Sequence, residues 1–112
     1  MNIENTQAQM RKGILEYCIL LVIARQDSYV QDIINKLKAS KMLVVEGTIY
    51  PLLTRLKNTG LLSYRWEEST QGPPRKYYSI TDEGRSFLQA MGNSWDELTA
   101  AIAALREQNT PQ

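Results

Sequence analysis

The chain has 112 residues, enough for one domain with a modest core, and its hydrophobic (43%) and charged (22%) fractions are those of an ordinary globular protein. It has no histidine and a single cysteine, Cys18, so an internal disulfide is excluded and no catalytic set is available; we expect no enzyme, no metal site and no cofactor. The net charge of +1 excludes a general polyanion binder, and the apolar stretch 14–24 is shorter than the roughly 20 residues that cross a bilayer, so we expect a cytoplasmic protein with no membrane segment.

The first predicted element is a helix that follows about eight frayed residues and ends near Arg25. Because apolar side chains also lie outside its main stripe, most of its surface is apolar, and a partner subunit is the expected cover for the second side. We interpret Cys18 as a small core residue of this helix. The stripe consists of Leu15, Cys18, Ile19, Val22 and Ile23.

A second helix is predicted from Ser28, which is placed as its N-cap with Gln31 in the capping-box position. Its buried stripe begins at Val30 and ends at Leu37. Residues 40–45 are expected to form a linker or a short strand.

The segment 46–56 predicts a third helix with an apolar back and a polar front. Its back carries Ile49, Leu52, Leu53 and Leu56 at the spacing of a buried stripe. The helix is expected to begin between residues 46 and 48, to hold Pro51 within its first turns and to stop at a C′ glycine, Gly60. The front has no carboxylate and mixes hydroxyls, an amide, an aromatic ring and cations, a surface that suits phosphates and base edges.

The charges are distributed unevenly along the chain. Residues 33–57 contain five cations and one anion, whereas residues 82–112 contain two cations and five anions. This asymmetry predicts that the middle of the chain faces a polyanion and that the C-terminal part faces away from it.

An antiparallel hairpin is predicted next, with strands at 61–68 and 75–80 joined by a turn at 69–74. Arg75 and Lys76 follow the turn, where they can reach phosphate oxygens. Adjacent strand residues point to opposite faces, so at least one of Tyr77 and Tyr78 is expected in the core.

Thr81 is the expected N-cap of a final helix that bears Asp82 and Glu83 in its first turn. An a/d heptad pattern runs along it, which indicates lengthwise packing against another helix. Residues 109–112 are expected to be a loose tail. The heptad positions are Leu88, Met91, Trp95, Leu98, Ile102 and Leu105.

This order of elements is that of a winged helix-turn-helix, a mainly α fold with a β-hairpin, in which the third helix enters the major groove and the hairpin lies over the backbone. We expect a DNA-binding domain at residues 1–81, whose first helix also contributes to dimerisation, and a dimerisation helix at residues 82–108. The predicted DNA contacts are Tyr29, Lys41, Thr48, Tyr50, Thr54, Arg55, Lys57, Arg75 and Lys76.

The chain resembles the PadR family of bacterial transcriptional regulators. The matching segments are residues 13–16, 28–29, 46–53, 56–61, 72–78, 81–84 and 94–95. The single C-terminal helix resembles the small branch of the family, which implies a dimer formed by that helix and the partner's first helix. The segment Ser28-Tyr-Val-Gln31 departs from the Ser-Tyr-Gly-Tyr that usually opens the second helix.

The resemblance also implies a homodimeric repressor that binds an inverted repeat in double-stranded DNA and is released by a small hydrophobic or aromatic effector. The effector site would comprise Met91, Trp95 and Leu98; the alternative is that Trp95 only packs the dimer seam. A winged-helix protein–protein module without DNA binding is the rival function. The predicted dimer interface is Leu15, Leu88, Met91, Trp95, Leu98, Ile102 and Leu105.

Overall fold

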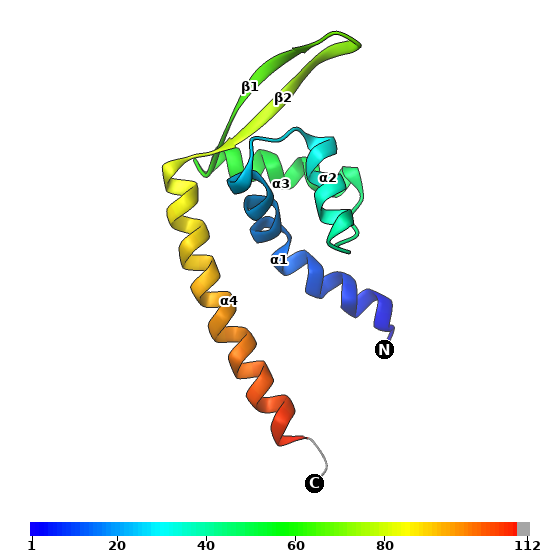
Figure 1. Ribbon diagram of the computed structural model, residues 1–112. Helices are drawn as coiled ribbons and strands as arrows, with labels where there is room; N and C mark the ends of the chain where they lie inside the picture. The colour runs from blue at the N-terminus through cyan, green and yellow to red at the C-terminus, as the bar shows by residue number, and fades with distance from the viewer. Residues whose placement is uncertain (110–112) are drawn as a thin grey trace.

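The computed structural model describes residues 1–109 and confirms the predicted order of three helices, a hairpin and a long helix (Figure 1). Residues 110–112, which belong to the expected loose tail, lie outside the described residues. The elements are α1 (Ile3–Arg25), α2 (Val30–Ala39), α3 (Glu46–Asn58), β1 (Leu62–Ser69), β2 (Gly72–Ile80) and α4 (Asp82–Gln108).

A single core forms where the C-terminal half of α1 meets α2, α3 and the base of the hairpin. The predicted stripes of the three helices supply most of it, and burial of each large aliphatic side chain contributes about 1.5–3 kcal/mol. Tyr78 of β2 is 5% exposed, which confirms the prediction that at least one of Tyr77 and Tyr78 is a core residue. The core residues are Leu15, Ile19, Leu20, Ile23, Ile33, Leu37, Ile49, Leu53, Leu56, Leu62 and Tyr78.

Helix α1 begins much earlier than the sequence predicts. The side-chain oxygen of Asn2 accepts hydrogen bonds from the backbone N–H groups of Glu4 (2.8 Å) and Asn5 (3.2 Å), which satisfies two donors that a helix start leaves free. The expectation of a frayed segment at residues 1–8 is therefore wrong. Periodicity gave no sign of this turn because its side chains are exposed and not packed on the core.

The predicted capping box of α2 is also wrong. The Ser28 hydroxyl donates to the Gln26 carbonyl (2.7 Å), and the Gln31 amide donates to Asn35 (3.0 Å), so neither caps the helix. Ser28 pairs instead with Tyr78: its N–H donates to the Tyr78 carbonyl (3.0 Å), and its carbonyl accepts from the Tyr78 N–H (2.8 Å). The turn before α2 thus adds a one-residue third strand beside β2.

The hairpin is longer than predicted because its turn is shorter. Strand β2 begins at Gly72, so the prolines assigned to a turn at 69–74 lie inside the strand. Ser69 pairs with Gly72 and Glu67 pairs with Arg75, which leaves one residue opposite two prolines in a bulge. A bulge in a two-stranded ribbon tolerates residues that lack an N–H. The extra length carries the hairpin out beyond the core (Figure 1).

Two residues with small side chains, Thr81 and Gly84, form the junction between the hairpin and α4. The Thr81 hydroxyl accepts from the Gly84 N–H (2.9 Å), which confirms the predicted N-cap, and donates to the Gly60 carbonyl (2.7 Å). Gly60 has a φ of 85°, as expected of a C′ glycine. Gly84 is buried against the Leu61 carbonyl. These contacts set the direction in which α4 leaves the domain.

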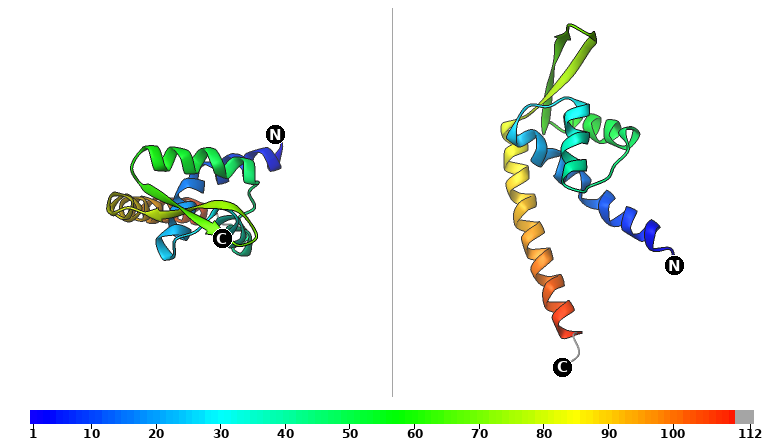
Figure 2. Two further views of the ribbon diagram at one scale, coloured as in Figure 1. Left: turned by 90° about the horizontal axis from the view of Figure 1, so that it is seen from above. Right: turned by 45° about the vertical axis from the view of Figure 1, so that its right-hand side comes forward.

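Beyond this junction α4 packs little against its own chain. Helix α4 and the first half of α1 leave the core in diverging directions (Figures 1 and 2). Leu88 packs against the core and Met91 is partly buried, but the later heptad side chains remain exposed: Trp95 by 37%, Leu98 by 53% and Ile102 by 45%. Leu15, by contrast, is 2% exposed in the core of its own chain. Within residues 1–109, no helix has the length and apolar character needed to cross a membrane.

Replacing Gly84 with alanine should destabilise the protein by more than about 2 kcal/mol. The new Cβ would overlap the Leu61 carbonyl and lie 2.7 Å from Cγ1 of Ile80. Alanine usually stabilises a helix by about 1 kcal/mol relative to glycine. The expected change in the free energy of unfolding therefore has the opposite sign at this position. Urea denaturation at a fixed protein concentration measures the change. Gly47→Ala is the control, because nothing lies within 4 Å of its Cβ; equal effects at both sites would contradict the close packing.

Candidate nucleic-acid interface

An open cleft of about 770 Å³ lies between the start of α2, helix α3 and the hairpin. We call the hairpin the wing and this hollow the wing cleft. Five of the nine predicted DNA contacts line it: Tyr29, Tyr50, Thr54, Arg75 and Lys76. The remaining lining residues are Val30, Gln31, Glu46, Trp66, Pro74 and Tyr78.

Helix α3 contributes one side of the wing cleft. Tyr50 and Thr54 are four residues apart and so share a face, while Ile49 and Leu53 beside them anchor the helix in the core. The Tyr50 hydroxyl donates to Glu46 (3.0 Å), and this bond to a carboxylate raises the pKa of Tyr50. The prediction that the front of this helix carries no carboxylate is therefore wrong for the part that faces the cleft.

The wing contributes a cation held over two aromatic rings. The Lys76 ammonium lies 4.6 Å from the centroid of Tyr64 and 5.5 Å from that of Trp66. Trp66 is 61% exposed, although it lies on the same face of β1 as the buried Leu62. Sequence reasoning missed it as a cleft residue. The sequence did contain a signal: Trp66 lies four residues beyond Leu62 in a two-stranded hairpin, and at that distance the strand has already extended past the small core.

A second stack of cations and rings lies along the other face of the wing, and its Arg75 and Tyr29 stand at the edge where this face meets the wing cleft. The Arg75 guanidinium lies 4.7 Å from the centroid of Tyr29, whose ring is 5.6 Å from that of Tyr77. Arg65 lies 4.8 Å from the Tyr77 centroid and donates to Asp27 (2.8 Å). Each exposed cation–π contact contributes about 0.5–1 kcal/mol, enough to bias where the cation sits.

The ion pair of Arg65 and Asp27 ties the wing to the turn before α2. The hydrogen bond from Arg65 lowers the pKa of Asp27 below its usual 3.8 and raises that of Arg65. The pair is therefore intact at neutral pH, and its contribution is lost as the pH falls through the lowered pKa of Asp27. Both side chains are nearly half exposed, so the pair positions the wing more than it stabilises the fold.

The other four predicted DNA contacts lie outside the wing cleft. Arg55 forms an ion pair with Glu16 of α1 (3.3 Å), and Thr48 borders a separate hollow beside the same helix. Lys57 lies 5.8 Å from the Tyr64 centroid, near the cleft. Lys41 is exposed in the connection from α2 to α3 with a φ of 65°, a conformation that is uncommon for a residue with a side chain.

The wing cleft is thus an exposed surface with two cations, one carboxylate, hydroxyls, an amide and aromatic rings. Cations of this kind bind phosphate oxygens, while hydroxyl and amide groups can bind base edges. Gln31, which replaces a tyrosine of the resembled pattern, supplies the amide. Within residues 1–109, no cluster of three or more His, Cys, Asp or Glu side chains could hold a metal ion.

Comparisons with known proteins agree on one family. The family model described as "Transcriptional regulator PadR-like family" matches residues 19–90. A PadR-like transcription factor from Bacteroides fragilis is 57% identical over 90% of this chain and 98% of that one, with a TM-score of 0.77. A PadR-like transcriptional regulator from Bacillus cereus is 39% identical over 87% and 95% of the two chains, with a TM-score of 0.76. Bacillus subtilis PadR, solved in complex with operator DNA, is 25% identical over 70% of this chain and 46% of that one, with a TM-score of 0.65.

Proposed function

The chain belongs to the PadR-like family of transcriptional regulators, and from this premise we propose that it is a homodimeric repressor that binds an inverted repeat in double-stranded DNA. Its place among regulators agrees with the expectation from composition that it is not an enzyme. The proposal has two parts, a DNA-contacting surface at the wing cleft and a dimer seam along α4. Residues 1–81 form the DNA-binding unit and residues 82–108 the dimerisation helix.

One observation carries the first part: side chains of α3 and two cations of the wing border the same open cleft. We assign Arg75 and Lys76 to phosphate contacts and Tyr50 and Thr54 to base edges. Tyr29 adds a ring beside Arg75. This assignment gives less weight to Arg55 than the sequence does, because its guanidinium is directed to α1 and its pair with Glu16 would have to break.

Replacing Arg75 or Lys76 with alanine should weaken DNA binding uniformly across sequences. Each lost phosphate contact should reduce the slope of log affinity against log salt by about one unit per subunit. Fluorescence anisotropy with a labelled duplex at several salt concentrations measures this slope. Lys38→Ala is the matched control, because Lys38 is an exposed cation of α2 outside the wing cleft. An unchanged slope in both cleft variants would contradict the assignment.

The rival is a winged-helix module that binds another protein and has lost DNA binding. Its affinity would change little between low and physiological salt, whereas a repressor loses orders of magnitude. The exposed cations of the wing cleft favour the DNA-binding function, since a buried protein interface is depleted of lysine.

The second part of the proposal is a two-fold dimer. In a single chain the heptad stripe of α4 is exposed from Trp95 to Leu105, and a row of large apolar side chains this regular is expected to be covered by another helix. The partner's α1 and α4 supply that cover. A two-fold axis along this seam would set two α3 helices about 34 Å apart, the spacing of successive major grooves.

Replacing Leu98 with glutamate should convert the dimer to a monomer while each subunit stays folded, because Leu98 is 53% exposed within its own chain. Static light scattering at micromolar concentration measures the mass, and circular dichroism checks the fold. Glu97→Gln, on the neighbouring exposed position, should leave the dimer intact. A wild-type protein that is already monomeric would contradict the seam.

The regulatory part of the proposal places a small planar hydrophobic effector against Trp95, with Met91 and Leu98 beside it. Trp95 is 37% exposed, so its ring face is available for stacking as well as for packing the seam. An effector would release DNA only if it favours a spacing of the two DNA-binding units that does not fit the operator.

Planar aromatic compounds should quench tryptophan fluorescence through Trp95. The quenching should be retained in Trp66→Phe and abolished in Trp95→Ala, since Trp66 lies in the wing cleft and Trp95 on α4. A fluorescence titration of the three proteins distinguishes the sites. Equal affinity in Trp95→Ala would show that Trp95 only packs the seam.

A further inference from the structure

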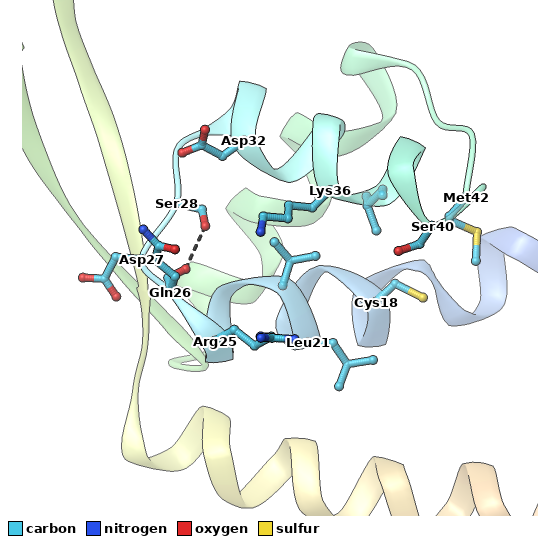
Figure 3. Close-up of a pocket in the computed structure, with 12 residues that line it drawn as sticks. Cys18, Leu21, Arg25, Gln26, Asp27, Ser28, Asp32, Lys36, Ser40 and Met42 are labelled. Carbon is cyan, nitrogen blue, oxygen red and sulfur yellow. Dashed lines mark hydrogen bonds between the residues drawn. The ribbon is translucent and has the colours of Figure 1, made fainter.

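A second hollow, of about 510 Å³, lies between the C-terminal half of α1 and helix α2 (Figure 3). We call it the α1–α2 hollow. Cys18, Leu21, Val22 and Met42 give it an apolar lining, and Lys36 of α2 stands over it. Its volume falls within the range of small-molecule sites, about 300–1,000 Å³.

The charged groups around this hollow are arranged asymmetrically. The ammonium of Lys36 points into the space between α1 and α2, whereas the carboxylates of Asp27 and Asp32 point away from it (Figure 3). Asp27 is engaged by Arg65 of the wing. Because Asp27 is already paired, the remaining charged groups of the lining are Arg25 and Lys36 against Asp32, which leaves one positive charge in excess.

We propose that the α1–α2 hollow binds a small amphipathic monoanion, an aliphatic carboxylate. The carboxylate pairs with Lys36, and the chain lies over Leu21, Val22 and Met42. An excess of one positive charge around the hollow suits a ligand with one negative charge better than a polyphosphate. The lining contains no aromatic ring, which separates this ligand from the planar compounds assigned to Trp95.

The position of the hollow connects it to the wing. Ser28 lines the hollow and is paired through its backbone with Tyr78, a residue of the wing cleft. A ligand that shifts the turn before α2 therefore also shifts the wing. This consequence rests on the proposed DNA-binding function, and linkage requires that DNA then alters the affinity for the carboxylate by the same factor.

The binding itself is tested without DNA, on the full-length protein, with octanoate as the probe and octan-1-ol as its neutral counterpart. With ¹³C-methyl-labelled methionine, the Met42 signal should shift in a saturable way, while that of Met91 on α4 should not. Octan-1-ol should bind about ten-fold more weakly, since it lacks the charge-assisted bond to Lys36.

Variants of two lysines on α2 complete the test. Lys36→Gln should weaken octanoate binding about ten-fold, Lys36→Arg should retain it, and Lys38→Gln should leave it unchanged, because Lys38 lies outside the hollow. Both lysines are exposed, so the fold is preserved in all three variants. Equal affinity for octanoate and octan-1-ol, a silent Met42 or an unaffected Lys36→Gln would each overturn the proposal. None of these results would alter the DNA-binding proposal, which uses different residues and a different ligand.

Discussion

Two backbone hydrogen bonds between Ser28 and Tyr78 hold the wing against the helices, and the rest of the recognition surface depends on them. Tyr78 is buried in the core, so the bonds are shielded from water and fix β2 at a depth that packing also enforces. The pairing places Tyr29, the next residue, beside Arg75 on the wing. The wing cleft exists because one residue of the turn before α2 behaves as a strand.

A second constraint lies just beyond Tyr78, where β2 ends and α4 begins. Thr81 and Gly84 fix the start of α4, but from Trp95 onward that helix leaves its apolar stripe uncovered within the chain. The wing cleft and the exposed stripe of α4 thus lie on different parts of the molecule. A rigid junction lets any change in how α4 packs alter the placement of the wing cleft, because Thr81 directly follows β2.

Local signals in the sequence were sufficient for much of this architecture. The stripe of α3, its C′ glycine Gly60 and the cap at Thr81 depend on neighbouring residues, and all three were predicted correctly. Nonlocal features were not accessible in this way. The pairing of Ser28 with Tyr78 joins residues fifty positions apart, and the ion pair of Arg55 with Glu16 joins two helices. The bulge that accommodates two prolines depends on strand register, which the strong turn formers at 69–74 concealed.

Selection of bound sequences from a random duplex library tests the central claim most directly, because every possible operator competes for the protein at once. A two-fold dimer that reads DNA with α3 and the wing should enrich an inverted repeat whose half-sites are centred about one or two helical turns apart, roughly 10 or 21 base pairs. Enrichment of a single unrepeated site would contradict the two-fold arrangement. No enrichment with a folded dimer would contradict sequence-specific DNA recognition by this chain.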